Sequence, residues 1–156
     1  MHSYFKTIKI TLLITLALSI HLEPVAAQSR TSVAKVVSFD MGGPIKSRRD
    51  EIRKLQRLGH RVEIRGQCFS ACTMYLGLPN VCVYPDAVLG FHGPKAMAGT
   101  LPTDVFDHWS NVMARNLRKP LQTWFMQRAR YVKSGVLRVS GATLINMGYA
   151  RCETPI

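Results

Sequence analysis

A strand, helix and strand pattern in the middle of the chain constrains the fold more than any other feature of the sequence. Residues 62–65 alternate between apolar and charged side chains, which predicts a short strand that ends at Gly66. Residues 68–76 follow as a helix, and residues 81–84 and 87–91 are β-rich. Strands that are joined through a helical crossover run parallel, so they end at the same edge of the sheet.

Two polar residues stand at that edge in the predicted topology. Ser70 begins the helix, and His92 directly follows the last strand. A serine at a helix N-terminus that faces an imidazole has the geometry of an activated nucleophile. The alternative is that Ser70 only caps the helix and that His92 is an ordinary hydrogen-bonded histidine at a strand end.

The chain before this pattern predicts one more strand and one more helix. Residues 33–40 are rich in β-branched side chains and are expected to form a buried strand, which ends before Gly42 and Gly43. The helix that follows is expected to be capped by Ser47 and terminated by Gly59. The two adjacent glycines are therefore expected at the sheet edge described above, unless they form an ordinary turn.

The second half of the chain predicts mainly helices. Residues 95–100 lack periodicity and are expected to form a loop beside the histidine, a candidate lid. Thr103 is expected to cap a helix, Pro120 to begin another that continues to Ser134, and residues 141–147 to form a short last helix. The order of elements predicts an α/β fold, with a parallel β-sheet, β-α-β crossovers and a C-terminal helical part.

The N-terminal residues have the features of a secretory signal peptide. Basic residues precede an apolar run over residues 10–22, and small residues that end at Ala27 form a cleavage site. The run is shorter than the roughly 20 residues that span a bilayer, which favours a cleaved peptide over an uncleaved anchor. We therefore expect a signal peptide over residues 1–27, one domain over residues 28–156, and a periplasmic or secreted protein.

The expected mature part contains four cysteines, Cys68, Cys72, Cys82 and Cys152. In an oxidising compartment they are expected to form two disulfides, for which three connectivities exist. We favour Cys68 with Cys72, which suits the start of a helix, and Cys82 with Cys152. The Cys-x3-Cys spacing lacks the second ligand pair of a zinc site, so neither a metal nor a cofactor is expected.

The chain carries a formal net charge of +12. One basic cluster is expected on the solvent face of the helix that precedes Gly59, opposite a buried stripe of Ile52, Leu55 and Leu58. Such a face either binds an anionic surface or an acidic partner, or is simply solvated. It has no interleaved aromatic side chains, which argues against nucleic-acid binding. Its members are Arg48, Arg49, Arg53, Lys54 and Arg57.

Three motifs in this order resemble those of the ClpP/crotonase superfamily, and most closely those of small exported ClpP-like proteins. Residues 38–43, SFDMGG, stand where the family has its Ser-x-Gly-Gly turn. Residues 68–72, CFSAC, stand at the nucleophile turn, and residues 83–94, VYPDAVLGFHGP, stand at the strand that carries the family histidine. Residues 140–149 resemble the closing helix. The resemblance implies a ClpP/crotonase-like fold that is shortened at its N-terminus.

Carried over by position, the resemblance makes Ser70 the nucleophile and His92 its general base. The backbone N–H groups of Gly43 and Ala71 would form the oxyanion hole, which suits a helix N-terminus because it favours developing negative charge. The peptidases of the family place an aspartate before the closing helix, where residues 136–139 contain none. The sequence leaves either a Ser-His dyad or a substitute carboxylate, from Asp86, Asp104 or Asp107.

These observations give two functional hypotheses. The first is a serine hydrolase that acts on a peptide or acyl bond. The second is a non-catalytic exported domain of ClpP-like fold that binds an anionic surface or a protein partner through its basic face.

Overall fold

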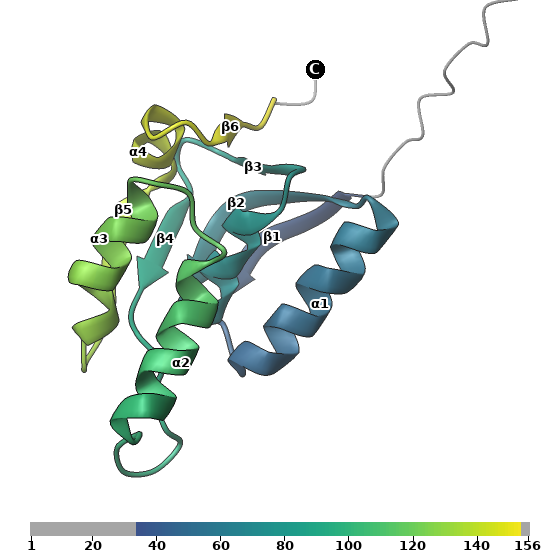
Figure 1. Cartoon of the computed structure of the whole chain (residues 1–156). Coiled ribbons are helices and arrows are strands. Elements are labelled where there is room, and N and C mark those ends of the chain that lie inside the picture. Colours follow the sequence, from purple (N-terminus) through teal and green to yellow (C-terminus); the bar gives the residue numbers. More distant parts are fainter. Residues whose placement is uncertain (1–33, 154–156) are drawn as a thin grey trace, which may run out of the picture. The chain divides into compact units, whose positions relative to one another are not determined.

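The structure, a computed structural model, describes residues 34–153. The predicted signal peptide lies outside the described residues. Within them the chain is a mixed α/β domain with one curled sheet of mostly parallel strands (Figure 1). The strands are β1 Ala34–Asp40, β2 Arg61–Phe69, β3 Val81–Val83, β4 Val88–Phe91, β5 Leu137–Ser140 and β6 Ala150–Arg151.

Strand β2 organises the sheet. It pairs in parallel with β1 along one side, and on its other side with β3 through its first half and β4 through its second half. β6 extends the sheet in parallel beyond β3, whereas β5 runs antiparallel beside β4. The predicted parallel arrangement of the first strands is therefore confirmed, but the C-terminal part is not purely helical, because β5 and β6 both belong to it.

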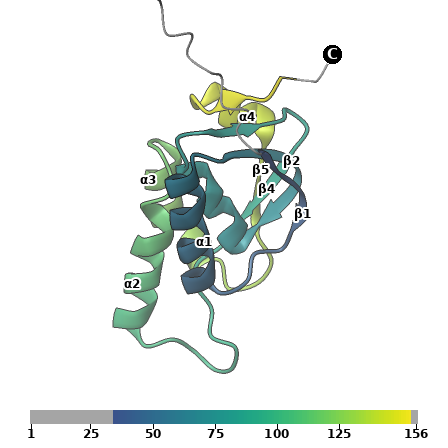
Figure 2. The ribbon, with the colours of Figure 1, turned by 90° about the vertical axis from the view of Figure 1, so that its right-hand side faces the viewer.

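Helices cover one face of this sheet. Figure 2 shows α1 and α2 on the same side of the strands, and the short 3-10 helix η1 packs against both of them. The helices are α1 Ile45–Leu58, η1 Ser70–Gly77, α2 Thr103–Ala114, α3 Leu121–Gln127, η2 Ala129–Tyr131 and α4 Gly141–Asn146. No helix within residues 34–153 is long and apolar enough to cross a membrane.

Strand β1 is an edge strand, and the prediction that it is buried is wrong. Only Val37 is buried in it, while the Phe39 side chain is 69 % exposed. A β-branched run without a breaker is typical of a buried strand. Helices α1 and α2 lie on one side of the strands (Figure 2), and Val36 and Phe39 of β1 remain exposed to solvent.

Strand β2 continues three residues beyond its predicted end at Gly66. A Cβ atom at Gly66 would lie 2.1 Å from the Ser38 carbonyl oxygen, at the irregularity where the register of β1 against β2 shifts. The glycine therefore permits a close approach within the strand and does not terminate it. Because of this extension, Phe69 is the last residue of β2 and Ser70 follows it directly.

Helix α1 begins at Ile45 after Pro44, so Ser47 lies inside the helix and does not cap it. Its end at Gly59, which has a φ of +65°, is as predicted. Leu58 is 54 % exposed, and Arg48 takes the third place in the buried stripe with Ile52 and Leu55. A stripe at 48, 52 and 55 fits the helical period as well as one at 52, 55 and 58.

The later helices match the prediction in part. α2 begins at Thr103, but its cap position is Pro102, and α3 ends at Gln127, well before Ser134. α4 begins at Gly141 as predicted, and it is capped by the Ser140 hydroxyl, which accepts a hydrogen bond from the Thr143 amide at 3.1 Å.

The favoured disulfide connectivity is confirmed. Cys68 is bonded to Cys72, which links the end of β2 to η1. Cys82 in β3 is bonded to Cys152, which directly follows β6. The second bridge joins cysteines 70 positions apart in the sequence and ties the end of the described chain to the sheet.

Candidate active site

Ser70 occupies a sharp turn between β2 and η1. Its φ of +57° makes it the only residue other than glycine with a left-handed backbone within residues 34–153. Such a conformation costs free energy for a residue with a Cβ atom and recurs where a strand delivers a nucleophile to a helix. The Cys68–Cys72 disulfide spans the turn and encloses Ser70.

The Gly42-Gly43 turn that follows β1 packs against this serine. Both glycines have positive φ values, +102° and +108°. A Cβ atom at Gly42 would lie 2.6 Å from the Ser70 Cβ and 2.9 Å from the Ala71 nitrogen, so only glycine allows the two turns to approach this closely. A Cβ at Gly43 would meet nothing within 4 Å, because this residue borders open space.

That space is a cavity of about 430 Å³, and Gly43, Ser70 and His92 all line it. We call it the site cavity. The expected convergence of three strand ends is therefore observed. Within the described residues, the Gly43 amide N–H has no backbone acceptor outside the helices and strands, and the Ala71 amide lies in the first turn of η1, where N–H groups lack a partner within the helix. The remaining lining residues are Pro44, Ile45, Lys46, Gly93, Pro94, Lys95, Leu101, Trp109 and Met113.

His92 is half-buried at the end of β4. Its Nδ1 lies 2.6 Å from the Gly93 carbonyl oxygen, which can only accept, so Nδ1 carries the proton and Nε2 is free to act as a base. Burial lowers the pKa of His92 below its ordinary value; the Gly93 hydrogen bond opposes this shift and the positive charge of Lys95 adds to it. No hydrogen bond joins His92 to Ser70 within residues 34–153.

None of the three candidate carboxylates orients this histidine. Asp107 forms an ion pair with Arg130, and neither Asp86 nor Asp104 is hydrogen-bonded to His92. The Gly93 carbonyl occupies the position of hydrogen-bond acceptor that a triad aspartate would fill at Nδ1. The local sequence contains no signal for a backbone acceptor.

Arg48 supports the Gly42 turn through hydrogen bonds, a role that the sequence did not reveal. Its Nη2 donates to the Asp40 carboxylate at 2.6 Å and to the Gly42 carbonyl at 3.1 Å. The other Asp40 oxygen accepts from the Gly42 amide at 2.8 Å. Both backbone polar groups of Gly42 are therefore held by one ion pair.

The expectation that Arg48 faces solvent is wrong, because it is only 8 % exposed. Its Nη1 donates to Glu51 at 2.9 Å and also to the Tyr75 hydroxyl, and the guanidinium lies 4.4 Å from the centre of the Tyr75 ring. The exposed basic residues of α1 are Lys46, Arg53, Lys54 and Arg57, while Arg49 is half-buried.

Comparison of the chain with the models of known protein families and with curated proteins finds no match.

Proposed function

We propose that this protein is an exported serine hydrolase that cleaves an acyl or peptide bond, built on a shortened ClpP/crotonase-like fold. One observation carries the proposal: a serine in a left-handed strand-to-helix turn shares a cavity with a histidine whose Nε2 is free and with a glycine whose amide has no backbone acceptor outside the helices and strands of the described residues. The parallel pairing of β1, β2 and β4 supports the proposed fold, because their ends bring these groups together.

In the first half of the reaction, Ser70 Oγ attacks the carbonyl carbon while His92 Nε2 takes the hydroxyl proton. The carbonyl π electrons move to the oxygen, and the amides of Gly43 and Ala71 donate hydrogen bonds to the oxyanion. The tetrahedral intermediate then expels the leaving group, which takes the proton from His92. The product of this half-reaction is an ester between Ser70 and the acyl group.

Water completes the cycle. His92 Nε2 removes a proton from a water molecule, which attacks the Ser70 ester through a second oxyanion. Collapse of this intermediate releases the carboxylic acid and returns the proton to Ser70. The protonated His92 that forms transiently keeps its Nδ1–H bond to Gly93 throughout, so the ring does not need to turn.

Ser70→Ala tests the proposal. We expect a fluorophosphonate to add one phosphonyl group to the mature protein at Ser70, measured by intact mass and peptide mapping. Ser70→Ala should abolish this labelling and ester hydrolysis, whereas Ser47→Ala, at an exposed position in α1, should retain both. A Ser70→Ala protein that hydrolyses esters at the parental rate would show that Ser70 is only a structural turn residue.

Export forms part of the proposal. Two disulfides in one small domain fit an oxidising compartment, since such bonds are rare in the cytosol. We expect cleavage after Ala27, so that the mature chain begins at Gln28. The intact mass of the protein secreted by its native export route measures this directly. Retention of residues 1–27 would replace cleavage by anchoring.

The exposed basic residues of α1 favour a second candidate, a binding domain for anionic surfaces. Arg53, Lys54 and Arg57 lie in the exposed part of the helix. Reversing these three charges to Glu should then weaken binding to vesicles that contain phosphatidylglycerol, most strongly at low salt. Under the hydrolase proposal alone, the triple variant keeps its labelling at Ser70. Unchanged vesicle binding would show that this face is only solvated.

A further inference from the structure

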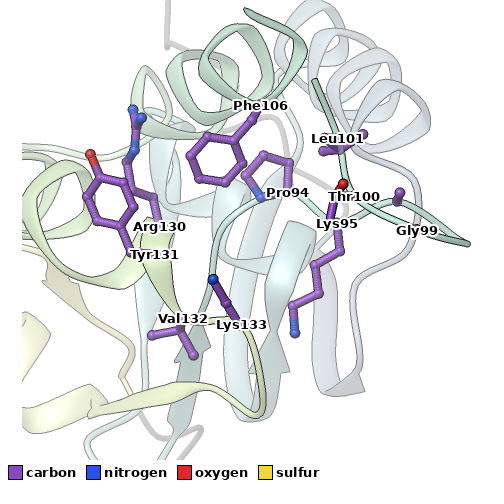
Figure 3. A pocket seen from close by; sticks show the side chains of 11 residues that line it. Pro94, Lys95, Gly99, Thr100, Leu101, Phe106, Arg130, Tyr131, Val132 and Lys133 are labelled. Atoms are coloured by element: carbon purple, nitrogen blue, oxygen red, sulfur yellow. The ribbon is translucent and has the colours of Figure 1, made fainter. Parts of the chain in front are cut away.

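A second cavity adjoins the proposed catalytic centre. It has a volume of about 490 Å³ and shares Pro94, Lys95 and Leu101 with the site cavity. We call it the outer pocket. Figure 3 shows the side chains that line it, with the rings of Phe106 and Tyr131 on one side and Lys95 on the other.

The outer pocket is anchored to the end of β4. A Cβ atom at Gly93 would lie 2.0 Å from the Arg130 carbonyl oxygen, so the residue after His92 packs directly on η2. Tyr131 and Val132, which line the pocket, follow Arg130 in the chain. The outer pocket therefore lies next to the residue that follows His92.

Its walls are mostly apolar. Leu101, Phe106 and Val132 supply aliphatic and aromatic surface, and the Tyr131 ring adds more. The charge of Arg130 is compensated by its ion pair with Asp107. Its guanidinium packs on the apolar wall, 4.9 Å and 4.8 Å from the centres of the Phe106 and Tyr131 rings. This lining suits an apolar chain.

Two further cations remain without a carboxylate. Lys95 and Lys133 line the outer pocket, and neither forms an ion pair within residues 34–153. The site cavity adds Lys46, and no Asp or Glu lines either cavity. A cleft lined by charges of one sign concentrates ligands of the opposite charge, and it binds more tightly a ligand that supplies a counter-charge.

We propose that the substrate carries an apolar acyl chain with a carboxylate on it. The inference rests on the proposed hydrolase function. The reacting carbonyl lies at Ser70, the chain occupies the outer pocket between Phe106 and Leu101, and the carboxylate meets the ammonium groups of Lys95 and Lys133. Both a dicarboxylic half-ester and a peptide with an acidic side chain offer this chemistry.

A matched pair of esters tests the inference. The 4-nitrophenyl monoester of suberic acid and 4-nitrophenyl octanoate have the same chain length, and only the first has a terminal carboxylate. We expect kcat/KM to favour the suberate at least tenfold, and the preference to shrink as salt rises. A peptide arm compares fluorogenic peptides with Glu or Gln before the cleaved bond and distinguishes the two sources of the carboxylate. Equal or better use of both neutral substrates would overturn the inference.

The Lys133→Gln variant tests where the substrate carboxylate binds. This residue lines the outer pocket but not the site cavity, and we expect the variant to lose most of the suberate preference. Lys119→Gln is the control, because Lys119 is exposed and lines neither cavity. An unchanged preference in Lys133→Gln would contradict the assigned position of the carboxylate.

Failure of the hydrolase proposal would be distinguishable from failure of the substrate inference. Hydrolysis of 4-nitrophenyl acetate, whose acyl group is too short to fill the outer pocket, and fluorophosphonate labelling report the Ser70 centre alone. Their absence would count against the hydrolase. The pocket is then tested by titrating Ser70→Ala with the monomethylamide of suberic acid and with N-methyloctanamide. Tighter binding of the anionic amide, lost in the Ser70→Ala, Lys133→Gln double variant, would support the charge preference, and equal binding would overturn it.

Discussion

Arg48 donates to the Asp40 carboxylate at 2.6 Å, and this ion pair holds both the amide and the carbonyl of Gly42. The Gly42 turn in turn packs against Ser70 and Ala71. Under the proposed function, we therefore expect Arg48 to act as a positioning residue for the oxyanion hole through the backbone of Gly42.

Arg48→Met should destabilise the protein and impair catalysis. Removing one partner of a buried ion pair costs roughly 3 kcal/mol, and Asp40 would lose its cation. Arg48→Lys keeps the charge but cannot donate in the same fork, so partial rescue is expected. Urea unfolding and kcat per fluorophosphonate-reactive site measure the two effects, and a fall in kcat with little change in KM identifies positioning. Arg53→Met, at an exposed site, should change neither. Parental kcat in folded Arg48→Met would contradict the positioning role.

Gly42→Ala should separate the two turns. The new methyl group would overlap Ser70 and the Ala71 amide, and a displacement of about 1 Å at a reacting group can cost on the order of 100-fold in rate. Gly59→Ala is the matched control, since Gly59 also has a positive φ but borders open space. It should lose about 1 kcal/mol of stability and keep its activity. Equal activity losses in the two folded variants would point to a general backbone effect.

His92 should set the acid limb of the pH profile. Its pKa is lowered, mainly by burial, so the neutral and reactive form persists below the ordinary histidine value of about 6.5. Activity should fall as the pH drops through this lowered pKa. Lys95→Met removes one lowering influence, so its acid limb should move to higher pH, whereas Lys119→Met should leave the limb in place. The pH dependence of kcat/KM measures this. A parental limb above about pH 6.5 would contradict the assignment of His92 as the base.

The two disulfides should contribute unequally to stability. The loop-entropy relation gives about 2 kcal/mol for the ring closed by Cys68 and Cys72 and about 4 kcal/mol for that closed by Cys82 and Cys152. Replacing each pair by alanines and measuring the free energy of unfolding in urea compares them. A larger loss in the Cys68→Ala, Cys72→Ala variant would show that the turn around Ser70 governs stability more than chain entropy does.

The sequence predicted the parts that local patterns determine. Alternation and β-branched residues located β1, β2 and β4, and the crossover rule brought Gly43, Ser70 and His92 to one edge. Sequence patterns failed where residues distant in the sequence determine burial and strand pairing. Arg48 is buried because Asp40 and Tyr75 offer it partners, and the short strands β5 and β6 exist because β4 and β3 present free edges to them. Gly66 carries the same ambiguity, since a glycine that ends a strand and one that admits a neighbouring backbone have identical local sequences.

The turn around Ser70 is constrained covalently only after the disulfide between Cys68 and Cys72 has formed. A chain that has just left the ribosome carries two free thiols there, and the left-handed serine then depends on packing alone. Under the proposed export, oxidation after translocation would fix the turn covalently. The proposed hydrolase would therefore mature in the order of export, oxidation and then full competence, which would spare the compartment of synthesis from its activity.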